Sequence, residues 1–284
     1  MSATLAQPAT FTIRPLAEKF SAEVTGIDLR QPLDAATRTA IWDAFVRHQL
    51  LVFRGQALSG DEQIAFSEQL GTLERHTIRN RGSAHPLLNV VSNLGPDGKP
   101  SGRLANQLWH SDKSFRPSPC SATILHAVTM PPQGGDTCFA DMYGAYEALP
   151  DAEKIAMADI QVIHSWELSL AKSGRQASAE EIADAPPMLH PLVRIHPESG
   201  RKALFMGEHA SHFAGQPMDV GRARLAELEA QATDAKFVYR HTWQTGDLLM
   251  WDNRCLLHRA DQNFDPGRYP RVLHRTCLRG TPPR

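Results

Sequence analysis

The sequence predicts a mostly β fold with helical decoration, of the jelly-roll type. Short segments rich in β-branched and aromatic residues recur through the second half of the chain, and turns such as QTGD separate them. Only a few segments keep the apolar spacing of a helix. The chain has 284 residues, 42% hydrophobic and 21% charged, a globular composition that excludes disordered, collagen-like and coiled-coil classes. Many short strands with few helices are typical of a jelly-roll double sheet.

The first elements are a helix and a buried strand. Asp34 can accept hydrogen bonds from the free N–H groups at the start of a helix over 35–48, where Ile41 and Phe45 keep a helical spacing. The apolar run LLVF at 50–53 then predicts a buried strand. We therefore expect one helix that leads directly into a sheet.

A second helix follows, and then a long irregular segment. Ser59 and Glu62 form the S-x-x-E capping box that marks a helix start, and Gly71 stands where a helix-ending glycine is expected. From His76 to Asn106 the chain is rich in Gly, Pro and Asn and has little periodic apolar surface. Loops of this length in a domain are usually functional or mobile, so we expect no regular element there.

The central part of the chain predicts two strands and two short helices. The segments 121–130 and 136–142 have a strand-like composition on either side of the turn PPQGG. Asp141 and Asp151 are suitable N-caps for the two short helices that follow. Residues 167–190 are polar and irregular, and we expect them to lack regular structure.

The last part of the chain predicts mainly strands. LVRIH at 192–196 and KALFMG at 202–207 flank the turn HPESGR as a hairpin, and 221–234 is an amphipathic helix. Four further strand-like runs are FVYRHTW, LLMW, CLLHRA and VLHRTCL, at 237–243, 248–251, 255–260 and 272–278. Because no linker-like stretch or internal repeat interrupts the chain, we expect a single domain over 1–284.

Charge and cysteine content exclude several classes. With 30 basic and 31 acidic side chains the net charge is −1, so we expect neither nucleic acid nor an anionic membrane surface as a partner. The four cysteines are far apart with no CxxC, which argues against a disulfide framework and a structural zinc site; they are Cys120, Cys138, Cys255 and Cys277. No signal-peptide pattern and no long apolar run is present, so the cytoplasm is the expected location.

Candidate metal ligands first occur in the segment WHSD. His110 and Asp112 are two positions apart, so on a strand both side chains would leave from the same face and could share one ion. This spacing alone is weak, because a His-x-Asp pair is expected about once by chance in a chain of this composition. A second segment, GDLLMWDNRCLLHRA, carries His258, and RYPRVLHRTCL follows it.

The order of such segments along the chain resembles a known family. They are LVFRGQ, DEQIAFSEQLG, ANQLWHSDKSF, PPQGGDTCFADMYGAYEALP, HPLVRIHPESGRKALFMGEHASH, FVYRHTW and GDLLMWDNRCLLHR. Together they resemble the taurine and dichlorophenoxyacetate dioxygenase family of iron(II)- and 2-oxoglutarate-dependent oxygenases, and most closely its aryloxyalkanoate branch. The resemblance covers nearly the whole chain and implies a double-stranded β-helix core, another description of a jelly roll.

The resemblance implies that His110, Asp112 and His258 are the catalytic metal site and hold Fe(II). Two imidazoles and one carboxylate on one face of an octahedral ion leave three adjacent positions open, which a cosubstrate and O₂ require. The ligands must be neutral His and ionised Asp, so we expect the affinity for iron to fall at acid pH. On spacing alone, a histidine such as His258 is more often a packed strand residue than a metal ligand.

The resemblance also implies residues that bind 2-oxoglutarate. In the family this cosubstrate chelates iron through its 1-carboxylate and 2-keto oxygen, and an Arg and a Thr hold its far carboxylate. The matching positions are Arg271 and Thr137, and a guanidinium suits the task because its planar fork binds a carboxylate bidentately. Arg275 would face the chelating carboxylate or the substrate anion, since positions four apart on a strand share a face.

Substrate-binding candidates follow from family positions with more alternatives open. They are His76, Asn106, Lys113 and Arg275. His76 and Asn106 could instead cap loops, and Lys113 could be solvated, because the position after Asp112 on a strand would face away from the ligands. We further expect the segment 76–106 to close over the substrate.

The implied reaction couples oxidative decarboxylation of 2-oxoglutarate to hydroxylation of an unactivated C–H bond. If the hydroxylated carbon bears an ether oxygen, the resulting hemiacetal collapses and the ether is cleaved. The expected partner is a small anionic organic substrate such as an aryloxyalkanoate. One alternative is a sulfonate or alkyl-sulfate dioxygenase of the same family, and another is a non-oxygenase jelly-roll metalloprotein with zinc on the same ligands. A homo-oligomer is compatible with the sequence, which does not determine the oligomeric state.

Overall fold

A seven-stranded sheet is the largest unit of the structure, a computed structural model that describes residues 11–17, 20–75, 85–172 and 174–284. Its strands lie in the order β1-β2-β3-β13-β5-β15-β4. A three-stranded sheet has the order β12-β6-β14, and two smaller sheets have the orders β11-β7-β8 and β10-β9. Sheets therefore dominate the described part of the chain.

The strands are β1 (Thr12–Pro15), β2 (Ala22–Thr25), β3 (Leu50–Phe53), β4 (Asn89–Ser92), β5 (Ala122–Thr129), β6 (Thr137–Asp141), β7 (Gln161–His164), β8 (Met188–Pro191), β9 (Val193–Ile195), β10 (Lys202–Leu204), β11 (Ala210–Phe213), β12 (Val238–His241), β13 (Leu248–Asp252), β14 (Leu256–Ala260) and β15 (Val272–Leu278). The helices are α1 (Ala35–His48), α2 (Gly60–Glu68), α3 (Met142–Glu147), α4 (Asp151–Met157), α5 (Trp166–Lys172), α6 (Ala179–Asp184), α7 (Met218–Ala232) and the 3₁₀ helix η1 (Ala235–Phe237).

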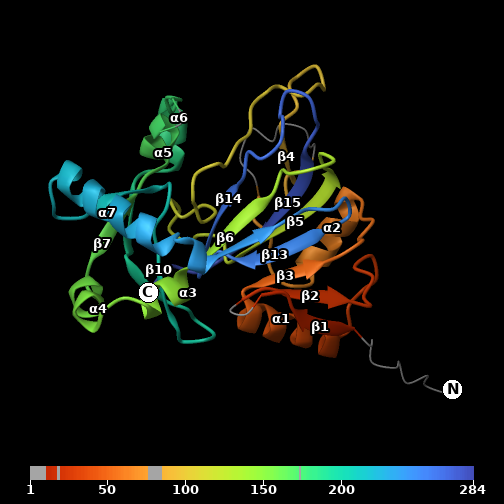
Figure 1. Ribbon diagram of the computed structural model, residues 1–284, viewed down its shortest axis with the longest axis horizontal. Coiled ribbons are helices and arrows are strands. Elements are labelled where there is room, and N and C mark those ends of the chain that lie inside the picture. Colours follow the sequence, from red (N-terminus) through yellow and green to blue (C-terminus); the bar gives the residue numbers. More distant parts are fainter. Residues whose placement is uncertain (1–10, 18–19, 76–84, 173) are drawn as a thin grey trace.

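The alternation of side chains along β13 explains how the main sheet is covered on both faces. Leu248 and Met250 pack with residues of α1 and α2 in one apolar cluster. Leu249 and Trp251 point to the other face and belong to a second cluster shared with β6 and β14. Figure 1 shows α1 and α2 beside the main sheet, whereas α5, α6 and α7 gather on the opposite side of the molecule.

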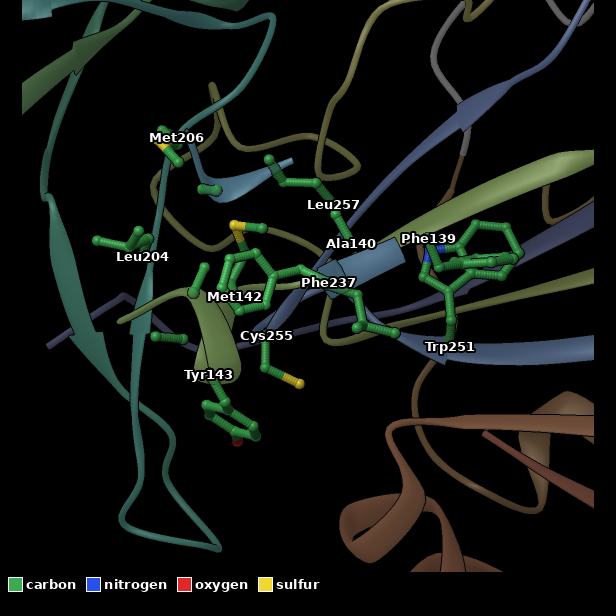
Figure 2. Packing of buried hydrophobic residues seen from close by; sticks show 14 of the residues in the cluster. Phe139, Ala140, Met142, Tyr143, Leu204, Met206, Phe237, Trp251, Cys255 and Leu257 are labelled. Carbon is green, nitrogen blue, oxygen red and sulfur yellow. The ribbon is translucent and has the colours of Figure 1, made fainter. Parts of the chain in front are cut away.

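The second apolar cluster joins the main sheet to the three-stranded sheet. Phe139 of β6 and Trp251 of β13 pack edge to face, with ring centroids 5.4 Å apart (Figure 2). Phe139 pairs with His258 across the β6–β14 ladder, so the cluster continues directly to a predicted metal ligand. The packing of these two sheets therefore determines where β14 presents its side chains.

Several predicted element boundaries are confirmed by the caps that define them. Asp34 accepts a hydrogen bond from the Thr37 backbone N–H at the start of α1. Ser59 and Glu62 form both bonds of the capping box of α2. The Asp141 side chain accepts from the Tyr143 N–H at the start of α3. These predictions hold because each cap and its partner lie within one turn of chain.

Two predicted helix ends are wrong. Gly71 does not end α2, because bonds from the Gln69 and Leu70 N–H groups to the carbonyls three residues earlier close the helix without a left-handed residue. Asp151 is the first helical residue of α4, and Pro150 is its N-cap without a side-chain bond. Local spacing thus located these helices but misplaced each of the two ends by one residue.

Two segments expected to be irregular contain regular elements. Residues 167–190 include most of α5, α6 and part of β8, and Ser178 with Glu181 forms a capping box at the start of α6. No described residue of α6 is buried, so the helix has no apolar stripe to reveal it. Within 76–106, β4 forms because Asn89–Ser92 pair with β15, a contact between distant segments.

All four cysteines are buried free thiols. In the described part of the chain, no helix combines the length and apolar character needed to cross a membrane.

Candidate metal centre and its cavity

A β-bridge between distant segments brings two predicted metal ligands together. His110 and His258 exchange backbone hydrogen bonds, with N···O distances of 3.0 Å and 2.8 Å. Their imidazole rings lie on the same side of this bridge, with centroids 4.1 Å apart. The pairing therefore places both rings within reach of one ion.

Asp112 completes this group from a turn. The sequence placed it on a strand with His110, but the chain leaves the bridge after His110 and turns at Asp112. The carboxylate oxygens lie 4.0 Å from His110 Nε2 and 3.7 Å from His258 Nε2. One ligand atom from each of the three buried residues lies within 4.8 Å of the other two.

The charge states of this group suit a divalent metal. Burial raises the pKa of Asp112, but nearby positive charge, first that of Arg275 at 2.9 Å from Oδ1, outweighs burial and holds it well below its usual range, with a smaller contribution from the Thr123 hydrogen bond. Burial, followed by the neighbouring His110, lowers the pKa of His258 well below the usual value. An ionised carboxylate and a neutral imidazole are the ligand forms that metal binding requires.

Hydrogen bonds leave the ligand atoms available. His110 Nδ1 lies 2.9 Å from the Leu108 carbonyl oxygen, which can only accept, so Nδ1 carries the proton and the Nε2 lone pair faces the group. Among the described residues, the buried Nδ1 of His258 has no hydrogen-bond partner. Two imidazole nitrogens and one carboxylate that converge in this way fit a facial Fe(II) site.

A cavity adjoins His258 between the main sheet and the three-stranded sheet. The residues that line it come from both sheets and from the loop before the bridge. They are Val91, Ala105, Asn106, Leu125, Thr137, Trp251, His258, Ala260, Arg271 and Arg275. The structure thus brings both predicted cosubstrate arginines and Thr137 into one cavity beside a predicted metal ligand.

Arg271 is a buried positive charge in this cavity, only 3% exposed. Its Nε donates to the Gly135 carbonyl oxygen at 2.9 Å, and Nη2 lies 3.4 Å from Thr137 Oγ1. Burial lowers its pKa to about 10, so the side chain is still charged at neutral pH. No carboxylate of the described residues lies within 4 Å of it. The Asp136 charge raises the pKa of Arg271 from a greater distance but forms no ion pair with it, and a buried guanidinium without a direct ion pair favours an anionic ligand.

Trp243 contacts the same anchor and was missed by the sequence analysis. Its indole Nε1 donates to Thr137 Oγ1 at 2.9 Å. Trp243 and Arg271 are both donors, so Thr137 accepts from them and its own hydroxyl hydrogen is available to an acceptor in the cavity. The only sequence signal for Trp243 is its place in the FVYRHTW motif, because its partner Thr137 lies on a distant strand.

The predicted substrate residues have different positions. Asn106 lines the cavity, has a left-handed backbone with φ of 62°, and its carbonyl oxygen accepts from the Ala260 N–H. Lys113 is not among the residues that line this cavity, and its ammonium group forms an ion pair with Glu74. His76 lies outside the described residues.

His209 is a further buried side chain near the group. Its ring centroid lies 6.3 Å from that of His110 and 4.9 Å from that of Phe115. Burial lowers the pKa of His209 to about 3, so the ring is neutral. The HASH segment that carries it has no spacing that reveals this position.

A family model and several known proteins are similar to this chain. Residues 12–277 match the taurine catabolism dioxygenase TauD, TfdA family. An alpha-ketoglutarate-dependent 2,4-dichlorophenoxyacetate dioxygenase from Cupriavidus pinatubonensis (strain JMP 134 / LMG 1197) is 44% identical over 259 residues, which are 87% of this chain and 90% of the relative. An alpha-ketoglutarate-dependent sulfate ester dioxygenase from Pseudomonas putida is 32% identical over 297 residues, covering 99% of this chain and 93% of the relative.

A solved structure is similar over almost the whole chain. The crystal structure of AAD-2 in complex with Mn(II) and N-oxalylglycine has a TM-score of 0.85 and 37% sequence identity. The match covers 96% of this chain and 99% of that chain.

Proposed function

We propose a substrate class and site roles for this chain from the premise that it belongs to the taurine catabolism dioxygenase TauD, TfdA family. The chain is a dioxygenase that depends on Fe(II), 2-oxoglutarate and O₂. Its proposed substrate is a small aryloxyalkanoate carboxylate, which it hydroxylates and cleaves at the ether. The observation that carries the proposal is the cavity in which Arg271, Arg275 and His258 meet.

His110, Asp112 and His258 are the proposed Fe(II) ligands. Bound Fe(II) supplies the activation of O₂ and the oxidation of 2-oxoglutarate. The protein contributes a carboxylate, two imidazoles and a site buried from water, which limits side reactions. Asp112 keeps its charge because Arg275 lies beside it.

Arg271 and Thr137 are the proposed anchors for the far carboxylate of 2-oxoglutarate. The guanidinium and the hydroxyl share one buried corner of the cavity, and both can donate to a carboxylate. Arg275 contacts Asp112 Oδ1 and lines the same cavity, so it is suited to the near carboxylate or to the substrate anion. Asn106 is the remaining described candidate for substrate contact at the cavity wall.

The proposed reaction is balanced. One oxygen atom of O₂ enters succinate as 2-oxoglutarate loses CO₂, and the other becomes the hydroxyl group on the substrate carbon. When that carbon bears an aryl ether oxygen, the hemiacetal releases a phenol and leaves an oxoacid. The same collapse on an alkyl sulfate would release sulfate and an aldehyde.

The sequence identities of the relatives, together with the substrates in their names, rank the substrate candidates. The 44% identical relative is named for 2,4-dichlorophenoxyacetate, and the 32% identical relative for sulfate esters. The aryloxyalkanoate class is therefore the main proposal, and an alkyl sulfate or sulfonate is the alternative. A non-oxygenase metalloprotein is set aside, because the chain is a dioxygenase.

We also propose a double-stranded β-helix fold and a cytoplasmic location for this chain. The main sheet and the sheet β12-β6-β14 pack through Phe139 and Trp251, which supports a double-stranded β-helix core in a single domain. Four buried free thiols support a reducing compartment such as the cytoplasm.

A succinate-release assay tests the proposed function. The Fe(II)-loaded protein is given 2-oxoglutarate, O₂ and one member of a panel of aryloxyalkanoates, alkyl sulfates or sulfonates, with phenol or sulfate measured in parallel. We expect an aryloxyalkanoate to give the highest rate, with phenol equal to the additional succinate over a control without substrate. A higher rate with an alkyl sulfate would select the alternative, and no stimulation by any panel member would overturn both.

A further inference from the structure

Three buried side chains, one of which lines the cavity, are hydrogen-bonded in series and end on Asp112. Trp251 Nε1 lies 3.2 Å from Asn253 Oδ1, and Asn253 Nδ2 lies 2.8 Å from Thr123 Oγ1. Thr123 Oγ1 lies 2.6 Å from Asp112 Oδ2. Thr123, Trp251 and Asn253 are each at most 1% exposed. The series therefore ends on a proposed metal ligand without contact with solvent.

Each bond in this series has only one possible direction. The indole N–H of Trp251 and the backbone N–H of Asp112, 3.2 Å away, can only donate, so both face the amide oxygen of Asn253. The amide nitrogen then faces Thr123, whose oxygen must accept. The Thr123 hydroxyl hydrogen is left for Asp112 Oδ2, which as a carboxylate oxygen can only accept.

The series also joins the turn of Asp112 to the main sheet. Thr123 lies on β5, and Asn253 follows directly after β13, its neighbour in that sheet. Asn253 holds the turn through two more bonds, because its side chain accepts from the Asp112 N–H and its carbonyl oxygen accepts from Ser111 Oγ at 2.8 Å. Both the backbone and the carboxylate of Asp112 are thus held by one amide and one hydroxyl.

We propose that Thr123 and Asn253 are positioning residues that hold the Asp112 carboxylate in its metal-binding orientation. This inference rests on the proposed role of Asp112 as an Fe(II) ligand. Without the Thr123 hydroxyl, Arg275 at Oδ1 is the remaining side-chain donor in the described structure, and the carboxylate can turn about its Cβ–Cγ bond. Removing outer-shell partners of this kind typically weakens metal affinity about 10- to 100-fold.

Metal affinity measured without turnover tests the inference. We would titrate the metal-free protein with Mn(II) under anaerobic conditions and follow free Mn(II) by its paramagnetic resonance signal. Thr123→Val removes the hydroxyl at nearly constant volume and should weaken Mn(II) binding about 10- to 100-fold. Thr123→Ser keeps the hydroxyl and should bind Mn(II) within a few-fold of the wild type.

Thr276→Val is the matched control. Thr276 is also fully buried in the main sheet and is hydrogen-bonded to Ser67, 2.7 Å away, but it is not part of the series. It should bind Mn(II) as the wild type does. Equal affinities in Thr123→Val and Thr276→Val would overturn the inference. If Thr123→Val does not fold, as judged by circular dichroism, Thr123→Ala serves the same test.

Combining the two substitutions tests whether Asn253 acts through Thr123. Asn253→Ala should weaken Mn(II) binding strongly in the wild type and less in Thr123→Val, because the series is already broken there. An equal loss in both backgrounds would show that Asn253 does not act through Thr123, and this would overturn the series.

Asp112→Ala separates this inference from the proposed function. Wild-type Mn(II) affinity in Asp112→Ala would remove Asp112 from the proposed ligands, and the inference would fall with it. A large loss in Asp112→Ala, together with wild-type affinity in Thr123→Val, would overturn the positioning role alone.

Discussion

At the scale of single residues, Arg271 is a buried guanidinium to which the described structure gives no carboxylate partner. Loss of one buried charge-assisted contact typically costs about 2–5 kcal/mol. We therefore expect Arg271→Ala to raise the Michaelis constant for 2-oxoglutarate by tens-fold or more. Succinate release at varied 2-oxoglutarate measures this, and Arg14→Ala, with a side chain 73% exposed, is the control.

The same experiment discriminates between the two cavity arginines. The Michaelis constant for 2-oxoglutarate could be unchanged in Arg271→Ala while the Michaelis constant for the hydroxylated substrate rises. That result would show that the roles assigned to Arg271 and Arg275 are reversed.

Trp243 gives a second prediction at this scale. Trp243→Phe keeps an aromatic ring in the core but removes the N–H that Thr137 accepts. A net hydrogen bond is worth about 0.5–1.5 kcal/mol, so the Michaelis constant for 2-oxoglutarate should rise about 2- to 10-fold. In a Thr137→Val background the substitution should have little further effect, and an equal rise there would contradict the role given to Trp243.

The buried His164 should make the free energy of unfolding depend on pH. Burial lowers its pKa well below the usual value, and it is fully buried with Nδ1 3.1 Å from Ser114 Oγ. The folded state thus keeps it neutral while the unfolded state binds a proton near pH 6.5, so its contribution is present above that pH and is lost as pH falls.

The measurement is urea unfolding of the metal-free protein at pH 7.5 and 5.5. His164 should account for about 1.4 kcal/mol of the loss between these values. His164→Gln, which cannot be protonated, should lose less stability over this interval than the wild type. An identical loss in both proteins would show that His164 does not titrate on unfolding.

At the scale of elements, one buried charge cluster joins the β9–β10 hairpin to the turn between β13 and β14. Asp252 binds Arg254 through two bonds of 2.8 Å and 2.6 Å and His196 at 3.0 Å. Arg254 also binds Glu198 at 2.6 Å. Burial raises the pKa of Asp252, but Arg254 and His196 outweigh burial and hold it well below its usual range.

This cluster predicts a large effect for a small substitution. Breaking a buried ion pair typically costs about 3–5 kcal/mol, and because Asp252→Asn leaves Arg254 with Glu198 as its remaining carboxylate partner, we expect a loss near the lower end of this range. Urea unfolding should show this loss. Asp28→Asn, which breaks an exposed pair with Arg30, should leave the unfolding midpoint nearly unchanged. Similar midpoints for the two variants would contradict the structural role of the cluster.

Local sequence patterns are sufficient to predict some elements but not others. The caps at Asp34 and Ser59 were predicted because a cap and its partner are close in the chain. The strand at 272–278 was predicted from its own composition. β4 was missed, because its hydrogen bonds come from β15 and its own residues carry little apolar periodicity.

At the scale of the whole molecule, metal binding should be linked to folding. Three buried ligands from two distant segments meet only in the folded state, so a metal ion binds the native chain far more tightly than the unfolded chain. Mn(II) at 100 times its dissociation constant should add about 2.7 kcal/mol of stability. We expect a rise in melting temperature that a chelator reverses and that Asp112→Ala abolishes. A rise of equal size in Asp112→Ala would place the ion elsewhere.

Some residues of the candidate site can be recognised from their spacing in the sequence, and others cannot. His110 and Asp112 stand out in sequence because they are two positions apart, although the strand geometry assumed for them is wrong. The resemblance identified His258, Thr137 and Arg271, and the structure brings them to one cavity or its edge. Their individual roles remain predictions that the substitutions above test.

The sequence by itself determined the sheet-dominated composition of the fold, several helix caps, most strands and the family, because these depend on local composition, on spacing within one element and on ordered motifs. Only the tertiary structure decided that Trp243 donates to Thr137, that Asn253 orients Thr123 and that Lys113 pairs with Glu74. These bonds join segments far apart in the chain. Such contacts form when sheets pack against each other, and periodicity within a single element carries no information about the partner it will meet.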